Sequence, residues 1–374
     1  MRGFISIILS VIMVMNLVSC GQEVNETEKI KIERNEQPLT VRKIEIPIEL
    51  QGYKYVYVKS FDGQYAVFTV ERVENIGDES YAGDTGKIIV YDVLNENIVH
   101  FINLDINSGK VGSAVKKGDK LYYTLYNRLD LNEKVYENNG LENQLLYSNS
   151  LDQHSNFSRL SITDDKLYMI CSKGEIGLAE YEFFALNEDE FKSVGVFKQE
   201  SEGFAVFLGM KDGKPIVNST VIGREEITFD RWIGDKKETV FRLKSELSHS
   251  YGQLDNMFIH PVESIDNDGR YNMMAVTDLN NKNVTEIGMM QGGFFDIYDN
   301  KGLMFTYGKS NEEIFLYEAK DNVLEISPVD IDVKGMNNHS YYMTDKNAFM
   351  IINSISFENL NMVKSEHQWY LLEY

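Results

Sequence analysis

The sequence predicts an all-β fold and, within that class, a β-propeller of seven blades, with six or eight blades as the alternatives. Short apolar strands that each follow a polar turn recur along the chain, and no stretch keeps the periodicity of an amphipathic helix. A repeat of roughly 40 to 50 residues that contains several short strands is typical of a propeller blade. We therefore expect one propeller domain over residues 41–374.

Seven units of this kind mark the expected blades. In each unit a turn rich in Asp, Asn, Gly or Lys precedes an apolar strand. The turns begin at Asp62, Gly118, Asp164, Asp212, Asp268, Asn300 and Asp345. Most are 45 to 56 residues apart, but the step from Asp268 to Asn300 is only 32 residues. The spacing predicts one such turn per blade.

A second type of strand follows most of these units and tends to end in an aromatic and a polar residue. Examples are residues 88–92, 145–148, 181–184, 314–318 and 369–373. Together the two patterns resemble the Asp-Gly-x-apolar and apolar-Tyr-Asp blades of TolB-like and YVTN-like propellers, and of propeller lipoproteins of Gram-positive bacteria. The resemblance covers roughly residues 50–374. Its motifs imply the architecture and indicate no particular activity.

The ends of the predicted domain suggest how the ring closes. Both faces of a blade pack on neighbouring blades, so inner strands should be continuously apolar, as residues 121–126 are. After residues 369–373 there is no room for a further strand, whereas residues 41–50 form an additional apolar strand at the front. We expect that strand to pair into the last blade and so remove an exposed edge.

The first 19 residues are predicted to be a signal peptide. A positive charge at Arg2 precedes an apolar stretch over residues 4–17, which is the layout of an export signal. As a helix this stretch would be about 21 Å long, whereas the hydrocarbon core of a bilayer is roughly 30 Å thick. A permanent membrane span is therefore not expected here.

The end of this segment, Leu17-Val18-Ser19-Cys20, resembles the lipobox of bacterial lipoproteins. The resemblance implies cleavage between Ser19 and Cys20, a diacylglycerol on the Cys20 sulfur, palmitate incorporation, and a position at the extracytoplasmic face of the cell membrane. Two acyl chains anchor a protein stably. The alternative is an ordinary secretory signal. Residues 20–40 are rich in Glu, Lys and Asn and are predicted to be an acidic, polar tether.

Charge and side-chain chemistry exclude several kinds of site. The net charge of −21 becomes −22 without Arg2, and no Lys and Arg cluster is visible, so nucleic acid is not an expected partner. Cys171 has no disulfide partner once Cys20 is acylated, and its apolar surroundings predict a buried, inert thiol. We expect no metal and no other cofactor. The histidines lack the spacing of metal ligands and are expected to be surface or packing residues: His100, His154, His249, His260, His339 and His367.

One acidic segment has a partial resemblance to a calcium loop. In Ser264-x-Asp266-x-Asp268-Gly269 the spacing is suggestive, but the twelfth position is Ala275, where a bidentate Glu is required. We interpret this segment as a turn.

Three functional hypotheses follow. The first is a membrane-anchored extracytoplasmic lipoprotein whose propeller is a binding or scaffolding module for a protein, peptide or glycan and is not an enzyme, because no catalytic motif or catalytic residue is found. The second is a propeller enzyme, a glycoside hydrolase or lyase, acting on cell-wall or environmental glycans through carboxylates from separate blades. The third is the solute-binding lipoprotein of an ABC transporter, which requires two α/β lobes.

Overall fold

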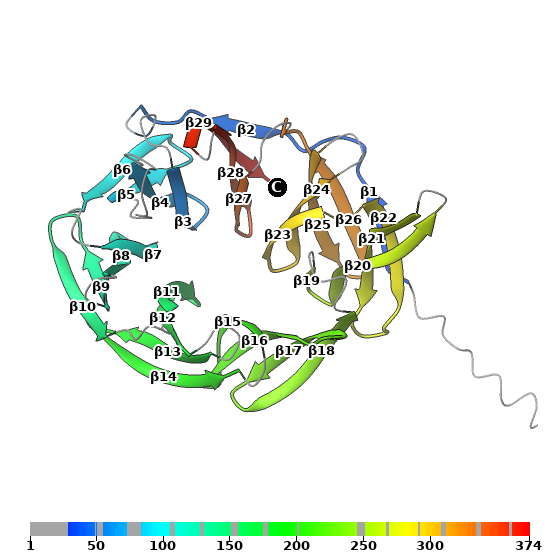
Figure 1. The fold of residues 1–374 in the computed structure, drawn as a ribbon, viewed down its shortest axis with the longest axis horizontal. Helices are drawn as coiled ribbons and strands as arrows, with labels where there is room; N and C mark the ends of the chain where they lie inside the picture. Colours follow the sequence, from blue (N-terminus) through cyan, green and yellow to red (C-terminus); the bar gives the residue numbers. More distant parts are fainter. Residues whose placement is uncertain are drawn as a thin grey trace, which may run out of the picture.

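The computed structural model describes residues 29–374 except 49, 51–54, 73–83, 105–108, 128–130, 151–155, 175–178, 200–201, 245–250, 267–268, 291, 308–311, 334–337 and 359–360. Seven sheets of four or five strands stand side by side around a central axis and form a closed ring (Figure 1). Every regular element among the described residues is a strand. The predicted all-β, seven-bladed propeller is therefore confirmed.

The strands of each blade run from the axis outward in chain order. Blades one and two contain β3 (Tyr55–Phe61), β4 (Tyr65–Arg72), β5 (Asp84–Asp92), β6 (Asn97–Asn103), β7 (Lys110–Lys117), β8 (Lys120–Asn127), β9 (Asn132–Asn138) and β10 (Asn143–Ser150). Blades three and four contain β11 (Asn156–Thr163), β12 (Lys166–Lys173), β13 (Glu180–Asn187), β14 (Glu190–Lys198), β15 (Gly203–Lys211), β16 (Lys214–Ile222), β17 (Glu226–Ile233) and β18 (Lys236–Lys244).

The remaining strands follow the same order. Blade five contains β19 (Gly252–Leu254), β20 (Met257–Asp266), β21 (Gly269–Asp278) and β22 (Val284–Met290). Blade six contains β23 (Gly292–Tyr298), β24 (Lys301–Tyr307), β25 (Glu312–Lys320), β26 (Val323–Val329) and, outermost, β1 (Lys31–Arg34). Blade seven contains β27 (Asn338–Met343), β28 (Asn347–Glu358), β29 (Asn361–Glu373) and, outermost, β2 (Val41–Ile44).

The N-terminal strand β2 closes the ring, as expected from the sequence, but it covers residues 41–44 and not the whole expected segment 41–50. It pairs antiparallel with the last strand, so that Val41 lies opposite Leu372 and Ile44 opposite Trp369. Ile44 and Trp369 are both fully buried. The Trp369 ring stacks on Phe68 of blade one, with 4.8 Å between ring centroids. The same pair of strands therefore completes blade seven and packs it against blade one.

The strand β1 lies within the segment that the sequence predicts to be a tether. It pairs parallel with β26, with Lys31 opposite Val323 and Arg34 opposite Ile326. Ile30 beside it is buried. Unpaired backbone groups at a sheet edge need partners, and this segment supplies them to blade six. Part of residues 20–40 is therefore attached to the propeller, while the domain boundaries themselves stay a prediction.

The predicted first turns are confirmed in six blades, and the one predicted for blade five is wrong. Six of them connect the first two strands of a blade, as Asp212 does between β15 and β16. The unit at Asp268 instead falls between β20 and β21, and the first turn of blade five is at Asp255. Both hairpins of this blade have turn-forming sequences, so local chemistry does not separate them. The correction explains the short 32-residue step, because Asp255 lies midway between Asp212 and Asp299.

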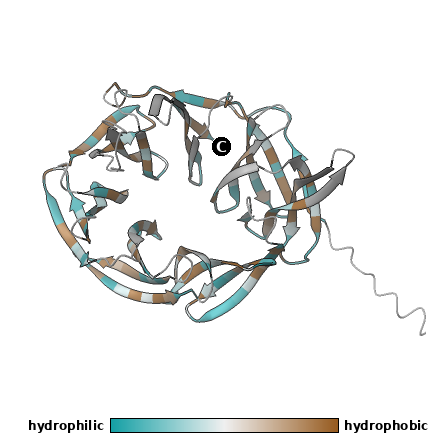
Figure 2. Ribbon diagram, viewed as in Figure 1, coloured by the Kyte–Doolittle hydropathy of each residue, from teal (hydrophilic) through white to brown (hydrophobic). Residues whose placement is uncertain are grey.

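The inner strands are buried on both faces, as the propeller architecture requires. All residues from Leu121 to Leu125 of β8 are buried, which confirms the interpretation of that continuous apolar run. Hydrophobic residues are distributed around the whole ring (Figure 2). The core therefore consists of several clusters between neighbouring blades, because each blade faces two others.

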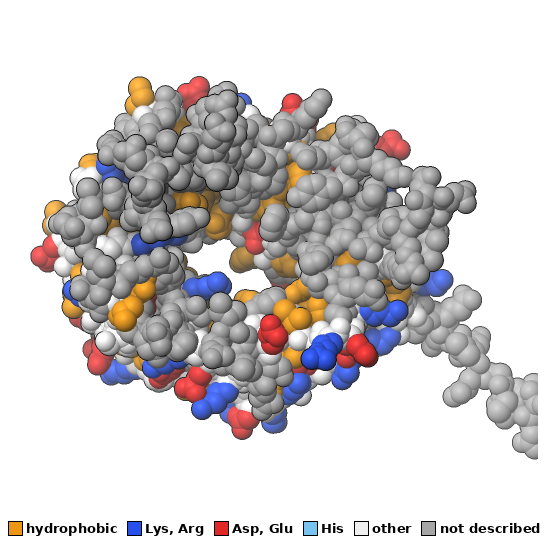
Figure 3. All heavy atoms as spheres, viewed as in Figure 1, with side chains coloured by type: hydrophobic (Ala, Val, Ile, Leu, Met, Phe, Trp, Pro, Cys, Tyr) orange, Lys and Arg blue, Asp and Glu red, His pale blue; other side chains and the backbone are white. Residues whose placement is uncertain are grey.

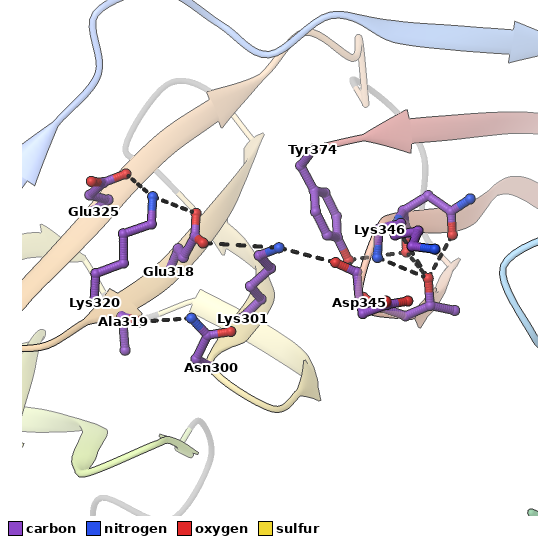
Figure 4. A network of polar contacts seen from close by, with 11 residues as sticks. Asn300, Lys301, Glu318, Ala319, Lys320, Glu325, Asp345, Lys346 and Tyr374 are labelled. Carbon is purple, nitrogen blue, oxygen red and sulfur yellow. Dashed lines mark hydrogen bonds and ion pairs between the residues drawn. The ribbon is translucent and has the colours of Figure 1, made fainter. Parts of the chain in front are cut away.

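A polar network connects blades six and seven (Figure 4). The Lys301 ammonium group lies 4.4 Å from the centre of the Tyr374 ring and donates to the Asp345 carbonyl at 3.2 Å. It also lies 3.9 Å from the Glu318 carboxylate. The Tyr374 hydroxyl in turn donates to the carbonyl of Thr344 at 2.9 Å. The C-terminal residue is thus fixed against the first turn of its own blade.

The third functional hypothesis is wrong. A solute-binding protein of an ABC transporter needs two α/β lobes, whereas the described residues form a single ring of strands. Over the same residues, no helix is both long and apolar enough to cross a membrane.

The closing strand can be tested by its buried isoleucine. We predict that Ile44→Ala lowers the free energy of unfolding by about 2 to 5 kcal/mol, because it leaves a cavity against Trp369. The matched control is Lys43→Ala on the exposed side of β2, which should change stability by about 0.5 kcal/mol or less. Urea unfolding measures both. Equal effects of the two substitutions would contradict a closing role for β2.

Candidate functional site

A pocket lies between blades four and five and reaches the beginning of blade six. Its volume is about 730 Å³. Strands β15 to β18, the segment around β19 and the end of β23 all contribute to its wall. In the space-filling view the centre of the ring is open, and side chains of both charges border the opening (Figure 3). This pocket is the candidate binding site.

The pocket lies beside the innermost strand of blade five, which is a short strand. β19 has three residues, whereas the innermost strands of the other six blades have six to nine. The aromatic side chains of Phe229 and Phe258 line the pocket beside it.

One wall of the pocket is apolar. Val206 and Leu208 of β15 are 46% and 42% exposed, although they belong to an inner strand. Both side chains line the pocket, with Leu208 at an irregularity of the β15–β16 register. Tyr251 lies behind them against Phe229, with ring centroids 4.4 Å apart. Exposed apolar side chains beside a concave surface are typical of a ligand-binding site.

A set of planar polar groups connects the two blades across this pocket. Arg231 Nε lies 3.3 Å from Asn218 Oδ1, and Arg231 Nη2 lies 3.3 Å from Gln253 Oε1. Gln253 Nε2 donates to the backbone carbonyl of Asp255 at 2.8 Å, which turns the amide oxygen toward the guanidinium. These groups can donate and accept hydrogen bonds in fixed planes, which suits the recognition of peptide or hydroxyl groups.

Carboxylates occupy the end of the pocket near blade six. Asp255 and Asp299 are exposed residues of the first turns of blades five and six, where both have positive φ. Asp296 is more enclosed and accepts backbone N–H groups of Met343 at 3.2 Å and of Ile297 at 3.1 Å. Burial outweighs these two bonds and raises the pKa of Asp296 to about 6. A carboxyl group in this range can exchange a proton near neutral pH.

Asp230 also borders the pocket, but its charge is already neutralised. Its carboxylate is buried and forms an ion pair with Lys237 at 2.8 Å. The Thr239 hydroxyl donates to its other oxygen at 2.8 Å. We therefore assign Asp230 to the support of β17 rather than to direct contact with a ligand in this pocket.

The site residues predicted from the sequence are not among the residues that line this pocket. Leu17, Val18, Ser19 and Cys20 are outside the described residues. Cys171 is buried, as expected, and its thiol lies 3.1 Å from the Ser158 hydroxyl. Burial raises the pKa of the Cys171 thiol to about 11, so the thiol stays protonated at neutral pH.

The histidines with described partners are packing residues. His260 is buried, with Nε2 2.8 Å from the Thr277 hydroxyl, and burial lowers its pKa. His100 Nε2 lies 2.9 Å from Asn138 Oδ1. Among the residues that the structure describes, no three His, Cys, Asp or Glu side chains are grouped so that they could hold a metal ion. The segment with partial resemblance to a calcium loop forms the β20–β21 hairpin, and Asp268 itself lies outside the described residues.

The residues of the pocket were missed at the sequence level. Arg231, Gln253 and Asp296 come from three blades, and no linear motif joins residues that only the ring brings together. A sequence signal was available in the Asp255-Asn256 turn. It would have predicted the end of β19 and the start of the next strand, β20.

Comparison with known proteins supports the fold. No protein-family model and no curated protein sequence matches this chain. Among solved structures, polysaccharide lyase Uly1 has a TM-score of 0.54 at 8% identity and covers 94% of each chain. The β-propeller domain of the Trilobed protease from Pyrococcus furiosus has a TM-score of 0.51 at 13% identity, with 85% of this chain and 93% of that chain covered. The acylaminoacyl peptidase of Pyrococcus horikoshii has a TM-score of 0.50 at 10% identity, with 82% of this chain and 50% of that chain covered.

These likenesses correct one expectation. The expectation that this chain is not an enzyme rested on the lack of a catalytic motif. That reasoning is wrong, because the same fold occurs in a polysaccharide lyase and in peptidases. At 8–13% identity the likeness shows the fold and establishes no activity for this chain.

The enclosed carboxyl of the pocket can be tested by its titration. We predict that Asp296 titrates with a midpoint of about 6, against the ordinary value of 3.8, in carboxyl-detected NMR of ¹³C-labelled protein. Because the pKa is higher in the folded state, this group stabilises the fold fully below pH 3.8, and the contribution is lost as the pH rises through about 6. Asp296→Asn should remove that resonance and that pH dependence. A midpoint below 4.5 would contradict the enclosure of the carboxyl.

Proposed function

We propose that this protein is a bacterial lipoprotein, acylated at Cys20, whose propeller stands outside the cell membrane and binds a peptide segment that carries a basic side chain. The lipobox-like residues Leu17 to Cys20 support the anchor. The pocket between blades four and five supports the binding role. The peptide is either free or part of a larger protein.

The observation that carries this proposal is the combination of groups in the pocket. Val206 and Leu208 offer an apolar wall for aliphatic side chains, and Arg231 with Gln253 offers hydrogen bonds for backbone amides and carbonyls. Asp255 and Asp299 place two carboxylates near the opposite end. The net charge of −21 adds a long-range attraction for cations. In a peptide with an apolar residue followed by Lys or Arg, the apolar side chain would contact the Val206 and Leu208 wall, and the basic side chain would reach the two carboxylates.

Asp296 supports a second candidate, a propeller enzyme that acts on cell-wall or environmental glycans. Its pKa of about 6 suits a general acid, and the neighbouring Asp299 lines the same pocket as a second carboxyl group. Release of new reducing or unsaturated sugar ends from cell-wall glycans, abolished by Asp296→Asn, would favour this candidate. Absence of turnover together with peptide binding would favour the first.

The anchor can be tested by metabolic labelling. We predict that the full-length protein incorporates labelled palmitate in a bacterial host and that Cys20→Ala abolishes the incorporation, because the thioether forms on this sulfur. Cys171→Ala is the matched control and should label like the wild type, since its buried thiol carries no lipid. Equal labelling of wild type and Cys20→Ala would sink the lipoprotein proposal.

The binding role can be tested with short peptides. We predict that acetyl-Leu-Lys-Leu-amide binds more tightly than acetyl-Leu-Glu-Leu-amide, and that Asp255→Asn with Asp299→Asn weakens the first by about five- to tenfold, because two rim charges are lost. Asp321→Asn is the control: it is an exposed turn residue with positive φ, like the other two, but lies outside the pocket. Calorimetry measures the affinities. Indifference to the charge of the peptide would refute the proposed ligand class.

A further inference from the structure

A second, smaller pocket lies at the seam between blades three and four. Its volume is about 150 Å³. It is on the opposite face of blade four from the candidate site, because alternate residues of a strand point to opposite faces. On β17, Phe229 and Arg231 line the candidate site, Thr228 and Trp232 line this second pocket, and Asp230 borders both.

The second pocket contains a buried amide without a partner. Gln199 follows β14 and is only 6% exposed, yet within the described part of the chain neither its Nε2 nor its Oε1 has a hydrogen-bond partner. Burying an amide with both of its polar atoms unpaired is costly. An amide in this position therefore indicates a site that takes up a complementary group.

The backbone around Gln199 holds the amide in place. The Gln199 N–H donates to the carbonyl of Ala179 at 3.1 Å, which fixes the residue to blade three. A Cβ atom on Gly203 would come within 2.8 Å of Gln199 Nε2 and 1.8 Å of the Thr220 carbonyl oxygen. Glycine at position 203 therefore leaves room for the Gln199 amide, and the fold determines where this amide lies.

The charged groups of the second pocket neutralise one another. Lys237 pairs with the buried carboxylate of Asp230 at 2.8 Å. Arg242 pairs with Glu226 at 2.9 Å. Neither sign of charge is in excess, and a charged ligand would have to break one of these pairs. The pocket therefore favours a neutral ligand.

Aromatic rings form the remaining side. Trp232 donates its indole N–H to Ser219 Oγ at 2.8 Å, which fixes the plane of the ring. Phe197 packs against that ring edge to face, with centroids 5.3 Å apart. These rings offer an apolar surface for a methyl group or for ring carbons close to the Gln199 amide.

We propose that the pocket between blades three and four binds the carboxamide group of a small neutral ligand. The carbonyl of the ligand accepts from Gln199 Nε2, and its N–H donates to Gln199 Oε1. A planar amide is the group whose donor and acceptor match both atoms at once. An N-acetylated sugar and a peptide amide share this chemistry. The inference is independent of the peptide site, which lies on the other face of blade four.

The test uses Trp232 as the reporter. The chain has two tryptophans, and the other, Trp369, is fully buried in blade seven. We expect N-acetylglucosamine or N-acetylglutamine amide to change the Trp232 fluorescence of the intact protein in a saturable way, whereas glucose and acetate do not. Whichever of the two amides binds identifies the source of the group.

Substitution of Gln199 tests the amide pairing itself. Gln199→Met keeps the length of the side chain, removes both hydrogen bonds and should weaken binding about tenfold or more. Gln144→Met, at an exposed position of β10, is the matched control and should bind as the wild type does. If Gln199→Met does not fold, Gln199→Glu is the second variant, because its carboxylate keeps an acceptor and loses the donor. Saturation-transfer NMR compares it with the wild type, and we expect it to lose most of the affinity as well.

Three results would overturn the inference. They are equal binding of glucose and N-acetylglucosamine, unchanged affinity in both Gln199 variants, or no saturable response to either amide, which would mean that the pocket holds structural water only. Asp255→Asn with Asp299→Asn should leave amide binding unchanged, so failure at this pocket and failure of the peptide site are separate outcomes.

Discussion

The propeller depends on the pairing of its first apolar strand with its last. β2 supplies the outermost strand of blade seven, and its Ile44 lies opposite Trp369. Trp369 then stacks on Phe68 of blade one. Since each blade is stabilised by two neighbours, a ring left open at this seam would expose the apolar faces of blades one and seven together. The Lys301 and Tyr374 contacts lie beside the same closure and restrain the C-terminal residue.

Blade four illustrates how the ring turns a simple sheet into binding surfaces. Alternate residues of β17 face two different neighbours, so Arg231 contributes to one pocket and Trp232 to another. The first pocket lies beside the short β19, and the glycine at position 203 makes room for the Gln199 amide in the second. The two sites differ in charge because the carboxylates of Asp255 and Asp299 lie at surface turns, whereas the charges near Gln199 are paired.

The lack of a catalytic motif carries little weight in a fold of this kind. A propeller assembles its sites from residues of separate blades, so residues that act together need not be near one another in the sequence. Arg231, Gln253 and Asp296 are such a set, spread over 66 positions of the chain. Solved propellers at 8–13% identity include a polysaccharide lyase and peptidases, and this likeness shows the architecture.

Local chemistry was enough to predict the strands, most of their turns, the closing role of a strand within residues 41–50 and the burial of Cys171. Each of these depends on apolar patterning and turn residues that are set by neighbours in the chain. It could not separate the Asp255 turn from the Asp268 turn, since both favour a hairpin. It also did not predict β1, whose partner β26 is some 290 residues away. The pockets were decided by tertiary structure alone, because the distance between Arg231 and Gln253 and the isolation of the Gln199 amide exist only once neighbouring blades have packed.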